Sequence, residues 1–471
     1  MRNNKSITNI IRVMLGNFTT IVSGVVVGFL LPKALSLSDY GFYKTFTLYI
    51  TYMGLFSLGI IDGIVLKYGS NDYEELNKPR FRAYYKYFTA VMAVVATAII
   101  VFALAFTKGD TRFILIMVGI DMVAGNMTNY FRQISQITQR FHEYSKRTII
   151  QSIAKIIITL SVTILCYVGY AVSYRLFLSL IVLMDVLLTI WYVSTYRELV
   201  IGASDPLVET RPHIANLIKI GFPLLFANLT IQIIMALDRQ FVSVLFTKEE
   251  YAIYAFAYNM LSLVTVAISA ISTVLYPTLK RTNTQNLKER YGSLISIILM
   301  LVFGTLAAFF PLCWILEWFL PKYIPSIEIF RIIFPGLAIS SAISIIMHNY
   351  YKVMNNSFSF FKKSVIILVI SAIANFISYY FFKTMAAISI ASILTMLIWY
   401  LYAEHYFVKN YGYKRYKNLS YLCLVMIVFY GITGINHGII GLISYMIVYV
   451  VISLLFFKEI FIGIKNHALF D

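Results

Sequence analysis

Charge is scarce in this sequence. Only 13% of its 471 residues are charged and 60% are hydrophobic, whereas a soluble domain averages about 25% charged and roughly 45–50% apolar residues. Acidic residues are the scarcest charged class, 21 against 39 Lys and Arg, which leaves a net charge of +18. In a soluble protein that excess would indicate a nucleic-acid partner. The composition excludes a soluble domain, so we expect no nucleic acid, and the basic residues report orientation instead.

Cysteine is also rare, and no catalytic motif is present. Cys166, Cys313 and Cys423 all lie within apolar runs, where they are typical small buried hydrophobes and form neither a disulfide framework nor a metal-binding spacing. The chain has no Walker loop, which argues against ATP hydrolysis. We therefore expect a protein without a cofactor or metal that is not an enzyme.

Long apolar runs are what the sequence has instead, and runs of about 20 residues span the hydrocarbon core of a bilayer. We predict an all-α polytopic membrane protein with about 14 transmembrane helices. The first run follows basic residues, as in a signal peptide, but it is longer than a signal's apolar region of about 7–15 residues. We therefore expect it to be retained. The predicted spans are 11–31, 46–67, 87–107, 113–131, 149–168, 174–194, 218–246, 252–276, 292–316, 328–351, 364–382, 386–407, 419–435 and 439–457.

Lysine and arginine are unevenly distributed between successive loops. If the N-terminus lies in the cytoplasm, about three quarters of the 39 Lys and Arg residues fall in segments on the cytoplasmic side, as the positive-inside rule requires. This asymmetry predicts an even number of spans with both termini in the cytoplasm.

The two halves of the chain repeat one another. NIIR at 9–12 opens the first span as NLIK at 216–219 opens the seventh, and SDYGFYKTFTLY at 38–49 corresponds to EEYAIYAFAYNM at 249–260. Because each copy has six spans, an even number, the copies share one orientation and are related by an axis along the membrane normal. Two such lobes are expected to enclose a cavity with alternating access. The predicted domains are an N-terminal six-helix lobe at 1–203, a C-terminal six-helix lobe at 204–418, and two additional helices with a cytoplasmic tail at 419–471.

Acidic residues within the spans are candidates for function, because charge at membrane depth is costly and normally faces the bundle interior or water. Asp62, Asp121 and Asp185 lie in the first lobe, and Asp238 lies in the second. Such carboxylates can couple transport to a proton or Na⁺ gradient. The alternative is a set of internal pairs, for example Asp121 with Lys155, that hold helices together.

Basic residues in or beside the spans are candidates for binding an anionic substrate. Arg239 lies in the seventh span, Arg331 in the tenth and Lys155 in the fifth, and Lys44 precedes the second. Arginine presents a forked donor that suits phosphate and carboxylate groups. If these residues face the expected cavity, they make its wall cationic. Alternatively, Arg239 pairs with Asp238, and Arg331 and Lys44 reach the lipid headgroups.

Tyrosine is abundant, with 36 residues. We expect much of it to form an aromatic belt at the two membrane surfaces. For five of the tyrosines, stacking on the sugars of a substrate is an alternative to the belt. The belt stays the favoured interpretation for these five, which are Tyr130, Tyr254, Tyr258, Tyr350 and Tyr351.

Four segments in order resemble the bacterial polysaccharide flippases, which translocate O-antigen and capsule repeat units and belong to the MATE-like (MOP) exporter superfamily. The segments begin with LPKALSLSDYGFYKTF at 31–46 and GFPLLFANL to EEYAIYAFAY within 221–258, and continue with LYPTLKR at 275–281 and LPKYIPSIEIFRIIFPG at 320–336. No single motif is diagnostic, but the ordered set extends the resemblance over nearly the whole chain.

The resemblance implies a flippase that moves an undecaprenyl-diphosphate-linked oligosaccharide from the inner to the outer leaflet of the bacterial plasma membrane, driven by an H⁺ or Na⁺ gradient. It implies two six-helix lobes around a cationic cavity and two extra C-terminal helices. The adjacent Asp238 and Arg239 match the family pattern, whereas Lys44, Lys155 and Arg331 carry over only weakly. Polysaccharide or lipopolysaccharide biosynthesis is then the pathway, with a glycan polymerase and glycosyltransferases as possible partners.

Two other functions stay open on the sequence. A drug or cation antiporter of the same superfamily would favour an acidic, aromatic cavity over a basic one. A membrane glycan polymerase or ligase would be expected to carry a large outer loop with catalytic Arg or His, and the predicted outer loops are short.

Overall fold

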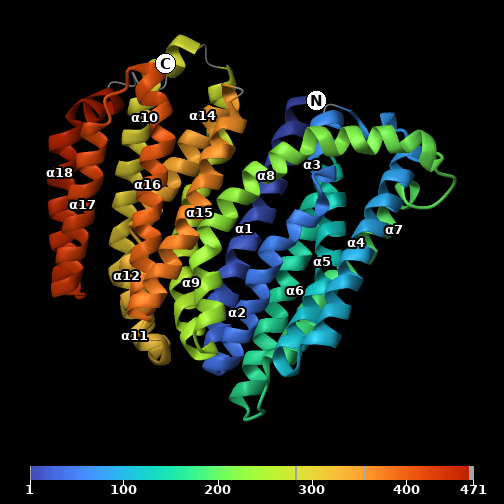
Figure 1. Ribbon diagram of the computed structural model, residues 1–471, viewed down its shortest axis with the longest axis horizontal. Coiled ribbons are helices and arrows are strands. Elements are labelled where there is room, and N and C mark those ends of the chain that lie inside the picture. The colour runs from blue at the N-terminus through green and yellow to red at the C-terminus, as the bar shows by residue number, and fades with distance from the viewer. Residues whose placement is uncertain (1, 70, 282–283, 355, 466–471) are drawn as a thin grey trace. The chain divides into compact units, whose positions relative to one another are not determined.

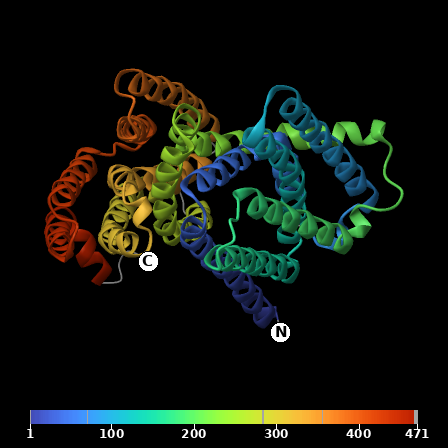
Figure 2. The same ribbon diagram turned by 90° about the horizontal axis from the view of Figure 1, so that it is seen from below.

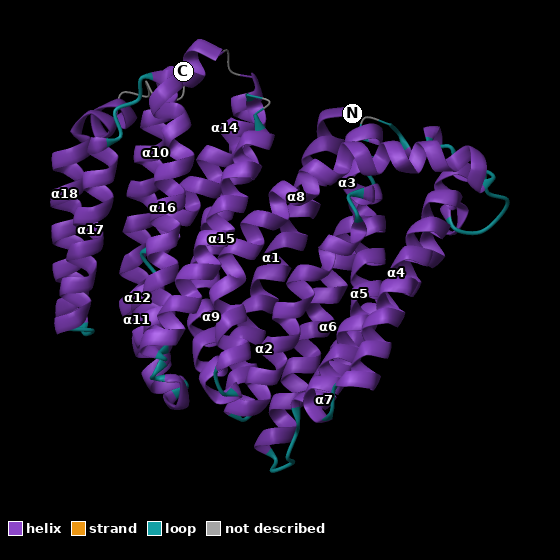
Figure 3. Cartoon of the chain, in the orientation of Figure 1, coloured by secondary structure: helices purple, strands orange, loops and turns teal. Residues whose placement is uncertain are grey.

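The computed structural model describes residues 2–69, 71–281, 284–354 and 356–465. Within these ranges the chain is helical and contains no strand (Figures 1 and 3). By length and hydropathy, 11 helices could cross a membrane, and 2 bent helix pairs raise the number to 13 when each pair is counted as one span. The predicted all-α polytopic fold class is therefore confirmed.

The eighth predicted span, 252–276, lies within α9 (Lys248–Arg281), a helix of 34 residues. α9 is not among the helices that qualify as spans over the described residues. Each of the other predicted spans falls on one of the qualifying helices or bent pairs. Thirteen of the fourteen predicted spans thus coincide with helices or bent pairs that qualify over the described residues, and the remaining one, 252–276, coincides with the helix α9.

The described chain divides into two compact units, Met1–Gln232 and Ile233–Asp471. The division falls inside α8 (Leu207–Leu245). The domain boundaries expected after residues 203 and 418 remain predictions, because compactness within a unit does not test where a repeat begins.

In the first unit, α5 is the central helix. The helices α2, α3, α4, α6 and α7 all pack on it, and α1 packs along α6 (Figure 2). The unit comprises α1 (Arg2–Ala34), α2 (Leu37–Tyr52), the short η1 (Met53–Ser57), α3 (Ile60–Tyr68), η2 (Tyr73–Glu75), α4 (Lys78–Phe106), α5 (Gly109–Ile137), α6 (Phe141–Tyr167), α7 (Tyr174–Thr195), η3 (Arg197–Leu199) and the beginning of α8.

In the second unit, the broken span formed by α12, α13 and α14 is central, with α9, α10 and α16 packed on it. The final pair, α17 and α18, lie side by side and contact α10 (Figure 1). The unit comprises the end of α8, α9, α10 (Thr284–Thr305), η4 (Leu306–Ala308), α11 (Phe309–Phe319), η5 (Pro321–Tyr323), α12 (Ser326–Ile333), α13 (Gly336–Ser341), the π-helical η6 (Ala342–Met347), α14 (His348–Val353), α15 (Ser357–Phe382), α16 (Met385–Tyr411), α17 (Tyr416–Ile435) and α18 (Ile439–Lys465).

The packing order within each unit agrees with a repeat. In both units, the fourth span of the copy is central, which is α5 in the first unit and the broken span α12 to α14 in the second. This span contacts the second, third and sixth spans of its own copy. The pairing of α1 with α6 has its counterpart in α8 with α15, where the Tyr379 hydroxyl donates to the Leu245 carbonyl at 3.5 Å and the Tyr379 ring packs on Phe246 with centroids 5.5 Å apart. Equivalent neighbours in the two copies are what a parallel repeat requires.

The second predicted span is broken, with a bend of 58° between η1 and α3. Leu58 (φ 53°) and Gly59 (φ 77°) both adopt the left-handed region there, which a glycine tolerates without strain. The backbone of α3 then touches the first part of α8. A Cβ on Gly221 would lie 2.0 Å from the Gly59 carbonyl oxygen and 2.4 Å from the Gly63 nitrogen. Small residues allow this close helix contact, as is common between membrane helices.

The loop that precedes α8 is held against the beginning of α4. Lys78 forms an ion pair with Glu198 at 2.5 Å and Arg80 one with Asp205 at 3.4 Å. Arg82 donates to two loop carbonyls at 2.8 Å each. The Lys78 ammonium lowers the pKa of the Glu198 carboxyl. These contacts explain why the residues just after 203 belong to the compact first unit.

Candidate functional site

The carboxylate of Asp238 on α8 is buried, with 2% of the residue exposed, and is held by donors from α9. Tyr254 donates its hydroxyl hydrogen to Asp238 Oδ2 at 2.7 Å, and Tyr258 donates to the same oxygen. The backbone N–H of Arg239 donates to Oδ1 at 2.7 Å. On α16, Ser389 Oγ donates to the Tyr254 hydroxyl at 3.3 Å. These hydrogen bonds join the three helices α8, α9 and α16.

The side chain of Arg239 does not form an ion pair with Asp238 within 4.0 Å in the described structure. Its Nη2 donates to the Met235 carbonyl at 3.2 Å, and its guanidinium lies 4.7 Å from the centroid of the Tyr258 ring. Its Nε is buried and has no hydrogen-bond partner among the described residues. Arg239 therefore keeps donor capacity that an anion could use.

Tyr258→Phe is expected to lower the stability of the folded protein by about 1.5–3 kcal/mol, the range for a hydrogen bond to a charged group. The change removes one of the two hydroxyl donors from a buried carboxylate and adds no volume. The apparent melting temperature of the purified protein measures the effect. Tyr380→Phe is the matched control, because Tyr380 is 66% exposed. Equal melting temperatures for the two variants would contradict the role assigned to the Tyr258 hydroxyl.

A second polar group lies inside the first unit, between α5, α6 and α7. Asp121 Oδ1 is buried without a hydrogen-bond partner in the described residues, and Asp121 interacts electrostatically with Asp185 and Lys155. Gln151 Nε2 donates to Asp185 Oδ1 at 2.7 Å, and Arg132 Nη2 donates to Gln151 Oε1 at 3.1 Å. The structure thus brings together three of the predicted residues, and no ion pair within 4.0 Å joins Asp121 to Lys155 in the described structure.

Lys44 lies on α2, where its Nζ is 5.2 Å from the ring centroid of Tyr40 and 5.8 Å from that of Tyr43. Tyr43 in turn interacts electrostatically with Asp185. Asp62 is half-buried in the first turn of α3, directly after the break in the second span. Lys44 therefore adjoins the polar group of the first unit, while Asp62 occupies a separate position.

Arg331 lies on α12 and faces α17, whereas Arg239 faces α9. A Cβ on Gly434 of α17 would lie 3.4 Å from Arg331 Nη1, and the neighbouring Tyr430 donates its hydroxyl hydrogen to the Ile332 carbonyl at 2.8 Å. The Nε of Arg331 is buried without a hydrogen-bond partner in the described chain. Within the second unit, the two predicted arginines thus belong to different helix interfaces.

Several residues of the site were not singled out from the sequence in these roles. The favoured belt interpretation is wrong for the five tyrosines, all of which lie in the interior or in helix contacts. The spacing of four residues between Tyr254 and Tyr258 places them on one helix face. This spacing is a signal in the sequence that the two hydroxyl groups share a partner. Arg132 and Gln151 lie near predicted helix ends, where polar residues are common and carry no such signal.

A model of the polysaccharide biosynthesis protein family matches residues 6–283, more than half of the chain. The chain belongs to this family. The resemblance inferred from the four sequence segments is therefore confirmed at the level of the family. Among curated proteins, none matches the chain.

Solved structures show the fold of this family member. A structure of the lipid II flippase MurJ in an inward closed conformation is 14% identical, with a TM-score of 0.70 over 97% of this chain and 100% of that one. An inward-facing multidrug resistance MATE family transporter of the MOP superfamily is 13% identical, with a TM-score of 0.60 over 85% and 98%. A MOP superfamily transporter from Pyrococcus furiosus is 12% identical, with a TM-score of 0.54 over 86% and 95%. At these identities the similarity concerns the fold alone.

Proposed function

We propose that this protein is a flippase that moves an undecaprenyl-diphosphate-linked oligosaccharide from the inner to the outer leaflet of the bacterial plasma membrane. The observation that carries the proposal is the match of residues 6–283 to the polysaccharide biosynthesis family. A fold shared with a lipid II flippase supports a role in translocation. Both termini are proposed to be cytoplasmic, from the distribution of lysine and arginine.

Arg239 is the residue that we propose binds the diphosphate. Taking a diphosphate out of water is costly unless charged donors replace its hydration. Among the described residues, nothing accepts a hydrogen bond from the Nε of Arg239, and its guanidinium is oriented by the Met235 carbonyl and the Tyr258 ring. Arg331, Lys44 and Lys155 are proposed as further cationic contacts. The lipid tail then stays in the hydrocarbon region while the polar head crosses by alternating access.

The carboxylates within the spans are proposed to couple transport to an H⁺ or Na⁺ gradient. Asp121 has a buried oxygen without a described partner and lies in the field of Asp185. Two neighbouring carboxylates disfavour double ionisation, so binding a proton or a cation relieves their repulsion. Asp238 is a second candidate, since it is buried and hydrogen-bonded in the other unit. Asp62, beside the broken helix, is the remaining one.

The proposal is tested by locating the lipid-linked oligosaccharide in cells that lack this protein. A flippase defect leaves the unit on the inner leaflet, inaccessible to a glycosidase added outside, whereas a missing polymerase or ligase leaves it exposed on the outer leaflet. Proteoliposomes containing the purified protein should then show translocation that depends on an H⁺ or Na⁺ gradient. Outer-leaflet accumulation, or export of a cationic drug in place of the lipid, would overturn the assignment in favour of a polymerase or an antiporter.

A further inference from the structure

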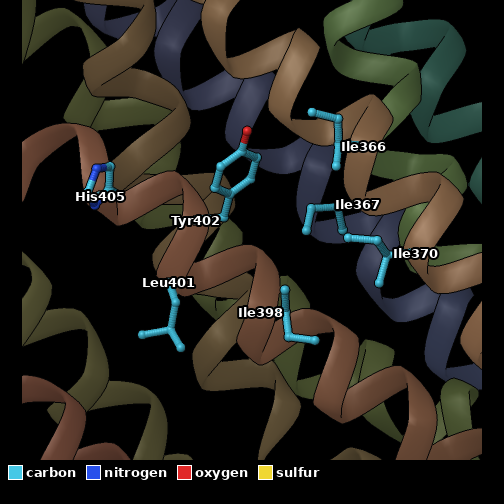
Figure 4. Close-up of a pocket in the computed structure, with 7 residues that line it drawn as sticks. All are labelled: Ile366, Ile367, Ile370, Ile398, Leu401, Tyr402 and His405. Carbon is cyan, nitrogen blue, oxygen red and sulfur yellow. The ribbon is translucent and has the colours of Figure 1, made fainter.

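An apolar groove lies between α15 and α16 in the second unit, with a volume of about 380 Å³. Ile366, Ile367 and Ile370 line it from α15, and Ile398 and Leu401 line it from α16 (Figure 4). Ile366 and Ile398 are half exposed, so the groove opens on the outside of the helix pair. Neither the ion-coupling candidates nor Arg239 contributes to its lining.

One end of the groove is polar and positively charged. Tyr402 and His405 complete its lining on the side toward the end of α16. Lys363 Nζ donates to the Tyr402 carbonyl at 3.0 Å and to the Tyr351 hydroxyl at 3.1 Å, which fixes an ammonium group beside the lining residue Tyr402. Lys362 is exposed next to it. The groove therefore has apolar walls and a cationic end.

We propose that this groove binds an anionic phospholipid of the inner leaflet. One acyl chain would lie between the isoleucines and Leu401, and the phosphate would lie at Lys362, Lys363 and His405. The charge asymmetry is the argument for this occupant, since a basic cluster at the cytoplasmic edge of a membrane attracts anionic headgroups. Both lysines fall in a segment that the positive-inside rule assigns to the cytoplasm.

The volume of the groove favours a phospholipid chain over the long lipid of the proposed transport substrate. About 380 Å³ lies at the small end of the 300–1,000 Å³ typical of ligand pockets, which is room for part of one chain. The inference does not depend on the proposed flippase activity, because it concerns a resident lipid on the outside of one unit.

Native mass spectrometry of the full-length protein in detergent, titrated with phosphatidylglycerol or phosphatidylcholine, tests the proposal. We expect selective binding of phosphatidylglycerol. Replacing Lys362 and Lys363 by Gln is expected to weaken it about fivefold per lysine, from roughly 1 kcal/mol for each charge near an anionic lipid surface. Lys383→Gln is the matched control at the opposite end of α15 and should leave the affinity unchanged.

The apolar part of the groove needs its own variant. Leu401→Trp should fill the groove and abolish binding, whereas Ile373→Trp on the exposed surface of α15, outside the lining, should not. If Leu401→Trp does not fold, photo-crosslinking of a phosphatidylglycerol analogue to the wild-type protein replaces it, with labelling expected within 362–370 and 398–405. Equal binding of phosphatidylcholine, labelling elsewhere, full competition by glycerol phosphate without a chain, or displacement by undecaprenyl phosphate would each overturn the proposal.

Discussion

Cells carrying Arg239→Ala in place of the wild-type protein are expected to lose most of their surface glycan while producing the protein at a normal level. The guanidinium is held by the Met235 carbonyl and the Tyr258 ring, and its Nε is buried and unused in the described structure. If that donor binds the diphosphate during transport, its loss removes a charge-assisted hydrogen bond at membrane depth. About 3 kcal/mol for such a contact corresponds to roughly a 100-fold lower transport rate.

Two controls separate binding of the substrate from folding. Arg290→Ala removes an exposed arginine from α10 and should leave surface glycan unchanged. Arg239→Lys keeps the charge but not the planar fork, so we expect it to retain only part of the activity. Surface glycan is measured by gel electrophoresis and the amount of protein by immunoblot. Normal glycan in Arg239→Ala cells at normal protein level would remove Arg239 from the proposed substrate site.

Gly221→Ala is expected to reduce the yield of folded protein more than any single alanine substitution at an open helical glycine. The new Cβ would lie 2.0 Å from the Gly59 carbonyl oxygen and 2.4 Å from the Gly63 nitrogen. Both obstacles are backbone atoms, so no side chain can rotate away, and α3 and α8 must separate. Forcing extra volume into a packed interface typically costs about 1–3 kcal/mol and occasionally more. We expect a loss at or above the top of this range.

The matched comparison is Gly24→Ala in α1, where an added Cβ would meet nothing within 4 Å. That change should be neutral or stabilise the helix by up to about 1 kcal/mol, because alanine is the better helix former. The two variants are compared by the monodisperse fraction in size-exclusion chromatography and by the apparent melting temperature. An unchanged melting temperature for Gly221→Ala would show that the close contact between α3 and α8 is not needed.

Most of the fold could be predicted because hydropathy acts locally. A run such as 364–382 must be helical and buried in lipid whatever its neighbours are, since its backbone groups have no water to bond. The break in the second span could not be predicted in this way. It depends on Leu58 and Gly59 adopting left-handed conformations while α3 packs on Gly221, and that contact joins residues far apart in the chain.

The sequence predicted which charged residues belong to the candidate site, but it did not predict which side chains each of them contacts. Asp121, Asp185 and Lys155 were identified because charge within a span is rare, and the structure brings them together. The sequence allows ion pairs of Asp121 with Lys155 and of Asp238 with Arg239, yet Asp238 is held by Tyr254 and Tyr258. Arg331 faces α17 while Arg239 faces α9. Side-chain partners depend on helix rotation, which hydropathy does not determine.

By itself, the sequence determined that this chain is a duplicated helical membrane protein, where its spans lie and which family it belongs to. It could do so because burial in lipid requires apolar residues throughout a span, and because the repeated segments are visible in the sequence itself. Only the tertiary structure decided which helix of each unit is central, where α3 bends away from η1, and which donors surround Asp238. Those features arise from contacts between distant segments, whose energies depend on the depth and rotation of each helix and not on its composition.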